Sequence, residues 1–206
     1  MTVTIVGLGD STTAGTPGFK SPLEAPPDGA GHPESQYGYW LMLDHPDWLV
    51  LNRGVNGERS DQIRARFSRD VIDERRRRVA DPFVVAIIAG VNDIYQGRSP
   101  QSVQHELQLM YDAAREAGLP VVAGSILPYN TATPEQNERM HAVNTWILDY
   151  AGTHPAIAFC DSRAAVAAPN HPNLLADSPD GLHPSAEGYR LMARALEPVI
   201  LRLLNT

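Results

Sequence analysis

The stretch VTIVGLGDSTTAG, residues 3–15, determines how the rest of the sequence is interpreted. It begins as an unbroken apolar run, Val3–Leu8, and then changes abruptly to Gly9-Asp10-Ser11. An apolar run that does not alternate is typical of a strand buried on both faces of a parallel sheet. The polar residues at its end have two simple interpretations. Either Asp10 or Ser11 caps a following helix, or Ser11 is a nucleophile.

Four further apolar runs rich in Val and Ile follow along the chain: Leu49–Asn52, Phe83–Ala89, Val121–Ile126 and Ala156–Cys160. Helical patterns lie between and after them: residues 60–77, 99–118, a segment starting at the capping box Thr133-Pro134-Glu135-Gln136, and one starting at Ser185. Strands that alternate with helices predict an α/β sandwich with right-handed crossovers. The length of 206 residues predicts one domain spanning residues 1–206.

The composition limits the classes of partner. The net charge of −7 argues against nucleic acid, which needs a basic surface. The basic run Arg75–Arg78 follows two acids and fits a solvated helix end. The single cysteine, Cys160, cannot form an internal disulfide. No apolar stretch is long enough for a membrane span, so we expect no membrane partner. The N-terminus does not resemble a signal peptide. We therefore expect a cytoplasmic protein, secreted only if a leader has been removed. The composition does not bear on the oligomeric state.

A nucleophilic serine needs a base and an acid that orients it. The segment DSPDGLHPSAEGY, residues 177–189, places Asp180 three residues before His183, just ahead of a predicted helix. A local turn there can hold a carboxylate and an imidazole beside one serine. Asp177 is an alternative orienting acid.

Two other loops carry hydrogen-bond donors. NRGVNGERS, residues 52–60, follows the second predicted strand, and AGVNDI, residues 89–94, follows the third. The carboxyl ends of parallel strands meet at one edge of a sheet, so both loops are expected beside the end of the first strand. Acyl transfer requires such donors, aimed at the developing oxyanion.

These segments resemble, in order and spacing, the four sequence blocks of the GDSL, or SGNH, hydrolase family: Gly9-Asp10-Ser11, Asn52 to Gly57, Gly90-Val91-Asn92-Asp93 and Asp180-Gly181-Leu182-His183. The resemblance covers nearly the whole chain, although Thr12 stands where the family name has leucine. It implies a flavodoxin-like, three-layer α/β/α sandwich around a central parallel sheet of about five strands. It also implies ester or thioester hydrolysis without a cofactor. No metal ion is expected, because no His/Cys/Asp cluster in the sequence has metal-ligand spacing and one cysteine cannot build a structural zinc site.

Residue by residue, the resemblance implies that Ser11 is the nucleophile, His183 the general base and Asp180 the acid that orients it. The backbone N–H groups of Ser11 and Gly57 and the side chain of Asn92 would form the oxyanion hole. Gly54 is an alternative donor to Gly57, although Gly57 fits the family spacing better.

Other residues have expected roles around this site. Tyr129, after the fourth strand, is a candidate wall of the acyl pocket. Asp10 and Asp93 are expected to brace their turns, and Tyr37, Trp40 and Leu41 to form a core stripe at helical spacing. The Gly- and Pro-rich segment at residues 16–35 is long enough to be a lid.

The predicted activity is serine esterase action on short-chain, soluble acyl esters, because no long apolar surface segment suggests a lipase. Alternatives with the same site are a carbohydrate O-acetylesterase, a lysophospholipase and an acyl-thioesterase. A different class is a non-catalytic nucleotide-binding module. Gly7-Leu8-Gly9 begins like G-x-G-x-x-G, but Thr12 stands at the third glycine and the sequence has no G-x-x-x-x-G-K-[ST].

Overall fold

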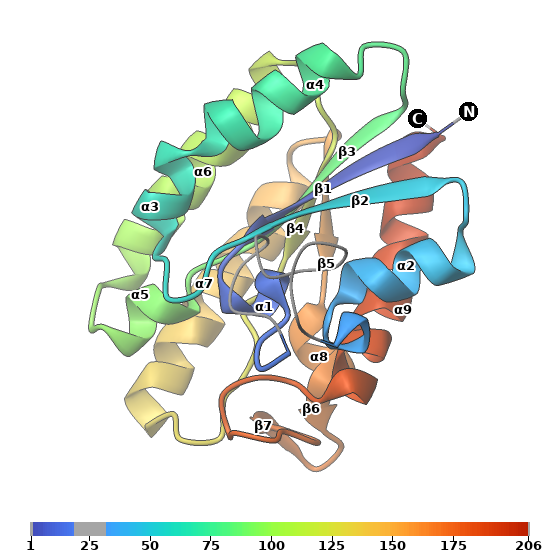
Figure 1. The fold of residues 1–206 in the computed structure, drawn as a ribbon. Coiled ribbons are helices and arrows are strands. Elements are labelled where there is room, and N and C mark those ends of the chain that lie inside the picture. The colour runs from blue at the N-terminus through green and yellow to red at the C-terminus, as the bar shows by residue number, and fades with distance from the viewer. Residues whose placement is uncertain (1, 19–31, 206) are drawn as a thin grey trace.

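Five parallel strands form the central sheet in the order β2-β1-β3-β4-β5 (Figure 1). The computed structural model describes residues 2–18 and 32–205. The strands are β1 (Val3–Gly9), β2 (Trp48–Gly54), β3 (Phe83–Ile88), β4 (Val121–Gly124) and β5 (Ile157–Cys160). The five predicted strands are therefore confirmed, with small differences at their ends.

Helices connect the strands. They are α1 (Ser11–Ala14), α2 (Tyr37–Asp44), α3 (Ser60–Ala65), α4 (Asp73–Arg77), α5 (Val91–Tyr95), α6 (Pro100–Glu116), α7 (Pro134–Gly152), α8 (Ser162–Val166) and α9 (Ala186–Leu204), with a 3-10 turn at Pro33–Ser35 and a π turn at Ser68–Ile72. A small antiparallel pair, β6 (Ala167–Ala168) and β7 (His171–Leu175), was not predicted. Within the described residues, no helix is both long and apolar enough to cross a membrane.

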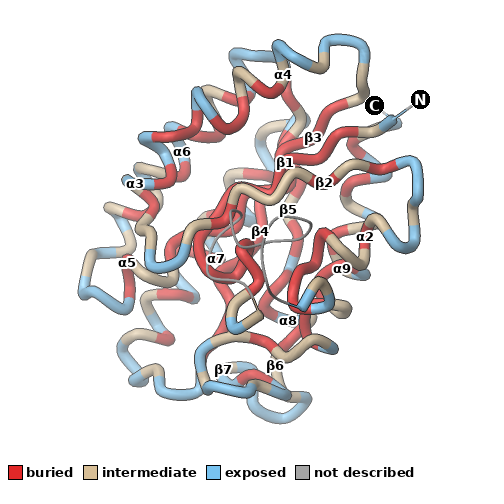
Figure 2. Tube along the Cα trace, in the orientation of Figure 1, coloured by how far each residue is buried: buried red, intermediate tan, exposed pale blue. Residues whose placement is uncertain are grey.

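The strands bury side chains on both faces, as their continuous apolar runs predict. Along β3, Val84 and Ala86 pack with α2 and α9, whereas Val85 and Ile87 pack with α3, α6 and α7. Figure 1 shows these two groups of helices on opposite faces of the sheet, and Figure 2 shows the buried strands between them. The fold is the predicted three-layer α/β/α sandwich.

Three predicted helix starts carry the expected caps. The Ser99 and Ser185 hydroxyls accept backbone N–H groups at the starts of α6 and α9, and Thr133 forms the capping box of α7 with Gln136. These bonds satisfy N–H groups that have no partner within the helix.

The segment predicted as one helix over residues 60–77 is instead α3, a π turn and α4. Its buried residues Ile63, Phe67 and Val71 are spaced by four. Such a spacing drifts by about 40° per step around a regular helix of 3.6 residues per turn. The wider π turn reduces this drift and keeps the three side chains toward the sheet.

The register of the sheet brings three strand ends to one level. Gly9, at the end of β1, lies opposite Gly54 of β2 and Ile88 of β3. The chain leaves β1 for β2 on one side and later returns to β3 on the other, so the strand order reverses at β1. This is the point at which open α/β sheets bind ligands.

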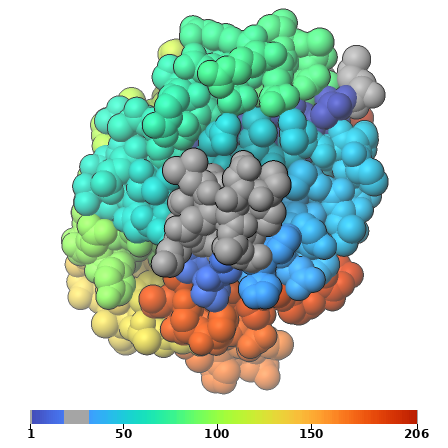
Figure 3. Space-filling model, in the orientation of Figure 1, coloured from blue at the N-terminus to red at the C-terminus, as the bar shows by residue number. Residues whose placement is uncertain are grey.

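Segments from both ends of the chain meet near this point. On the face shown in Figure 3, the blue segment around α1 adjoins orange-red residues from the C-terminal part of the chain. The Tyr189 hydroxyl of α9 donates to the Thr16 carbonyl across 2.7 Å.

Candidate active site

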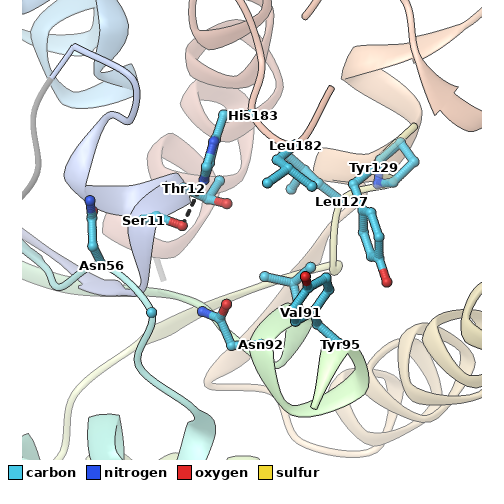
Figure 4. A pocket seen from close by; sticks show the side chains of 12 residues that line it. Ser11, Thr12, Asn56, Val91, Asn92, Tyr95, Leu127, Tyr129, Leu182 and His183 are labelled. Carbon is cyan, nitrogen blue, oxygen red and sulfur yellow. Dashed lines mark hydrogen bonds between the residues drawn. The ribbon is translucent and has the colours of Figure 1, made fainter. Parts of the chain in front are cut away.

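A chain of hydrogen bonds links Ser11, His183 and Asp180. His183 Nε2 lies 2.9 Å from Ser11 Oγ (Figure 4). On the other side of the ring, His183 Nδ1 lies 2.7 Å from Asp180 Oδ2. These are the distances expected between a nucleophile, its general base and the acid that orients the base. The structure thus brings together the three residues that the sequence blocks single out.

A tight turn over residues 180–183 holds the acid and the imidazole together. Asp180 Oδ1 accepts the backbone N–H groups of Leu182, at 2.9 Å, and His183, at 2.8 Å. Gly181 adopts a φ of +74°, a conformation that side chains with a Cβ rarely take. The Ser178 hydroxyl donates to the His183 carbonyl across 2.6 Å and closes the turn.

The charge of Asp180 suits it to orient the histidine. Partial burial raises the pKa of this carboxyl, but hydrogen bonds from the His183 ring and from two backbone N–H groups lower it more, so the pKa lies below its usual range. An ionised Asp180 accepts a hydrogen bond from the Nδ1–H group of His183 and so favours the tautomer in which Nε2 is unprotonated and faces Ser11. Asp177, the alternative acid, is exposed as Asp180 is, but Asp180 is the one that contacts the His183 ring, whereas the backbone carbonyl of Asp177 accepts the Ser185 N–H.

Ser11 is the first residue of α1, where helix N–H groups have no partner within the helix. The carboxylate of Asp10 caps this helix by accepting the Thr12 N–H at 3.0 Å, as its expected structural role requires. Asp10 is buried, with 1% of its surface exposed. This burial raises its pKa from 3.8 to about 7.

The loop after β2 offers one of its two candidate glycines to the site. Gly57 lines the cavity and has a φ of +77°. The Gly54 N–H instead donates to Asn52 Oδ1 at 2.9 Å. The backbone of α1 approaches Gly54 so closely that an added Cβ would lie 2.0 Å from Ala14 N. Gly54 is therefore packed closely against α1, whereas Gly57 lines the cavity beside Ser11.

Asn92 lies near the start of α5, facing the cavity from the end of β3. Its Nδ2 donates to the Glu58 carbonyl at 2.9 Å. A side-chain amide has two donor hydrogens, so this bond leaves one for an oxyanion.

Asp93, expected to brace its own turn, also links the two donor loops to each other. It accepts the Ser60 N–H at 2.7 Å and the Ser60 hydroxyl at 2.8 Å, and Arg98 donates to it at 2.8 Å. Burial raises the pKa of Asp93, while these bonds and the Arg98 charge act in the opposite direction.

The cavity beside Ser11 has a volume of about 270 Å³. One side is apolar and aromatic and is formed by Val91, Tyr95, Leu127, Pro128, Tyr129 and Leu182. In Figure 4, Leu127, Tyr129 and Leu182 lie across the cavity from Asn56. Tyr129 occupies the predicted wall position with 2% of its surface exposed, whereas Tyr95 is 61% exposed at the rim. The two rings meet edge to face, with their centroids 6.1 Å apart.

The sequence analysis did not predict several of these wall residues. Val91, Leu182 and Tyr95 stand inside or next to the motifs, but only the fold shows that they line the cavity.

The predicted core stripe is confirmed, with Tyr37 and Leu41 buried and Trp40 packed partly against the same core.

Two other expectations concern the surroundings of the site. Within residues 2–18 and 32–205, no group of three or more His, Cys, Asp or Glu side chains could hold a metal ion. The predicted lid over residues 16–35 falls largely on residues 19–31, which lie outside the described residues.

The sequence model of the GDSL-like Lipase/Acylhydrolase family matches residues 8–191. The chain belongs to this family. It is therefore a hydrolase, and this assignment favours catalysis over the nucleotide-binding alternative.

Relatives agree with this assignment. The chain is 26% identical over 166 residues to an acetylxylan esterase of Geobacillus stearothermophilus, covering 71% of this chain and 69% of that protein. A crystal structure of a lipolytic G-D-S-L family member from Veillonella parvula shares 20% identity, with a TM-score of 0.75 over 98% of this chain and 100% of that chain. A catalytic mutant of an acetylxylan esterase from Geobacillus stearothermophilus shares 19% identity, with a TM-score of 0.74 over 97% and 95%. At these identities the two structures show the shared fold.

Proposed function

We propose that the protein is a carboxylic ester hydrolase that acts on short-chain, soluble acyl esters through an acyl-enzyme on Ser11. The observation that carries the proposal is the hydrogen-bonded chain from Asp180 through His183 to Ser11, which opens onto a cavity.

The first half of the reaction forms the acyl-enzyme. Ser11 Oγ attacks the ester carbonyl while His183 Nε2 takes its proton, and Asp180 stabilises the imidazolium that results. The N–H groups of Ser11 and Gly57 and the amide of Asn92 stabilise the oxyanion of the tetrahedral intermediate. The intermediate collapses and His183 gives its proton to the leaving alcohol.

The second half repeats these roles with water. His183 takes a proton from the water molecule that attacks the acyl-serine. The same donors stabilise the second oxyanion, and Ser11 leaves with the proton from His183. Free acid and free enzyme result, without any other reactant.

The size of the cavity supports a short acyl group. Its volume of about 270 Å³ lies just below the range of about 300–1,000 Å³ that small-molecule sites commonly enclose. The apolar side formed by Leu127, Tyr129 and Leu182 suits the hydrocarbon part of an acid more than a charged group.

A second candidate is an O-acetylated carbohydrate. Two observations favour it over a lysophospholipid or an acyl-thioester: the acetylxylan esterase among the relatives, and the exposed Tyr95 ring at the rim, which can pack against a sugar ring.

The test is hydrolysis of p-nitrophenyl esters from acetate to palmitate, with EDTA present. We expect activity that falls with acyl length and is lost in Ser11→Ala. Asn92→Ala should lose about 100- to 1,000-fold in kcat, as expected when one oxyanion donor is removed. Ser68→Ala, an exposed serine away from the cavity, is the control and should keep full activity.

Acetylated xylo-oligosaccharides, lysophosphatidylcholine and an acyl-thioester complete the panel. Faster release of acetate from the sugar than from p-nitrophenyl acetate would favour the carbohydrate substrate. Full turnover by Ser11→Ala would refute the nucleophile, and full turnover by Asn92→Ala would refute the oxyanion assignment.

A further inference from the structure

A buried guanidinium group contacts the donor loop at residues 52–60. Arg66, which follows α3, has 7% of its surface exposed. It donates to the Gly9 carbonyl at 2.7 Å and to the Arg53 carbonyl at 2.8 Å. It also donates to the carboxylates of Glu58 and Asp70, each at 2.6 Å. One side chain thus contacts four separate points of the backbone and side chains around the site.

Two of these contacts hold the ends of neighbouring strands. Gly9 ends β1, two residues before Ser11, and Arg53 is the last residue but one of β2. Strand ends that are tied to one rigid, planar group keep a fixed spacing. These two carbonyl contacts add to the pairing of β1 with β2, which sets Gly9 opposite Gly54.

Glu58 connects the same guanidinium to the candidate oxyanion hole. It directly follows Gly57, and its carboxylate accepts Arg66 Nε. Its backbone carbonyl accepts the amide of Asn92 at 2.9 Å. Glu58, the residue after Gly57, therefore binds Arg66 through its side chain and Asn92 through its backbone carbonyl.

We propose that Glu58 and Arg66 are positioning residues for the oxyanion hole: the ion pair holds the Gly57–Glu58 backbone so that Gly57 and Asn92 aim their donors at the same point beside Ser11. This inference rests on the proposed function. Neither residue is among those that line the cavity, so both act through the donors.

The size of the effect follows from the geometry that oxyanion stabilisation needs. Donors must lie about 2.7–3.1 Å from the oxyanion, and small displacements of reacting groups cost large factors in rate. Displacing the donors should lower kcat less than removing one of them does. We therefore expect Glu58→Ala to lose about tenfold in kcat, with KM within about twofold of the wild-type value. Asp70 still neutralises Arg66 in this variant, so the chain should fold.

Glu58→Gln keeps an oxygen that can accept from Arg66 and should lose only about threefold. The matched control is Glu106→Ala, which removes a carboxylate of α6 that pairs with Arg64 of α3, away from the cavity. This control should keep the wild-type kcat, even if its melting temperature falls as much as that of Glu58→Ala.

The deciding measurement combines these variants with Asn92→Ala. If Glu58 acts through the donors, the tenfold effect of Glu58→Ala should shrink to about threefold or less once Asn92 is alanine. Binding of phenylboronic acid, which forms a tetrahedral adduct on a nucleophilic serine, should weaken in Glu58→Ala by about the same factor as kcat.

Several outcomes would overturn the inference: an unchanged kcat in Glu58→Ala, an equal loss in Glu106→Ala, or a full tenfold effect in the Asn92→Ala background. If Glu58→Ala does not fold, the same cycle is run with Glu58→Gln. A threefold loss in kcat that persists undiminished in the Asn92→Ala background would then overturn the inference. Turnover by Ser11→Ala would instead refute the proposed function, so the two failures can be told apart.

Discussion

The buried carboxyl of Asp10 should make the stability of this protein depend on pH. Burial raises its pKa from 3.8 to about 7, so the folded chain binds this proton more tightly than the unfolded chain does. As far as this group is concerned, the free energy of unfolding is greatest below about pH 4 and falls as the pH rises toward 7. The difference of about three pH units, at about 1.4 kcal/mol each, corresponds to a free energy on the order of 4 kcal/mol.

Asp10→Asn removes the titration and keeps an acceptor for the Thr12 N–H, because asparagine caps helices as well as aspartate does. We expect the variant to gain about 3 kcal/mol over the wild type between pH 5 and pH 8, the range that contains most of the titration.

Urea unfolding followed by far-ultraviolet circular dichroism, at half-unit steps from pH 5 to pH 8.5, measures this difference. Asp149→Asn, which changes an exposed carboxylate on α7, is the control and should run parallel to the wild type. Parallel curves for Asp10→Asn and the wild type would show that the native protein solvates or pairs this carboxylate, and would refute the reasoning.

Three further changes have expected outcomes. Asp180→Asn should lower kcat/KM by about 100- to 10,000-fold while substrate binding is retained, because His183 loses the acceptor that sets its tautomer; a loss below tenfold in a p-nitrophenyl acetate assay would contradict this role. Gly54→Ala should cost at least about 3 kcal/mol, because its Cβ would meet the backbone of Ala14, and denaturant unfolding with an unchanged midpoint would disprove the close contact. Thr133→Ala should cost about 1 kcal/mol through loss of the capping box, with full esterase activity, and thermal unfolding measures this loss.

The features that the sequence predicts well are those set by local chemistry. The apolar runs mark the five strands because parallel strands are buried on both faces. Ser99, Thr133 and Ser185 mark helix starts because their hydroxyls accept N–H groups within the next three residues. The Asp180–His183 turn is equally local, since all of its bonds lie within a few residues.

Features that depend on distant residues were harder to predict. The β6–β7 pair consists of short strands in which only Leu175 is buried, so their pattern differs little from that of a loop. The choice between Gly54 and Gly57 depends on how closely α1 approaches β2, which no spacing reveals. The role of Arg66 was missed for the same reason. A single arginine in a charged helix resembles a surface residue until the strand ends that it contacts are placed in space.

The contact between Ser11 and His183 joins positions 172 residues apart. Closing so long a segment costs chain entropy that only contacts formed elsewhere can offset. Under the proposed mechanism, turnover therefore appears only after the sheet has formed and the segment that precedes α9 has docked on α1. Recovery of esterase activity during refolding should lag behind recovery of helical signal. A protease cut ahead of α9 should abolish esterase activity while most of the sheet remains folded. Esterase activity would then indicate that this last segment is in its native position.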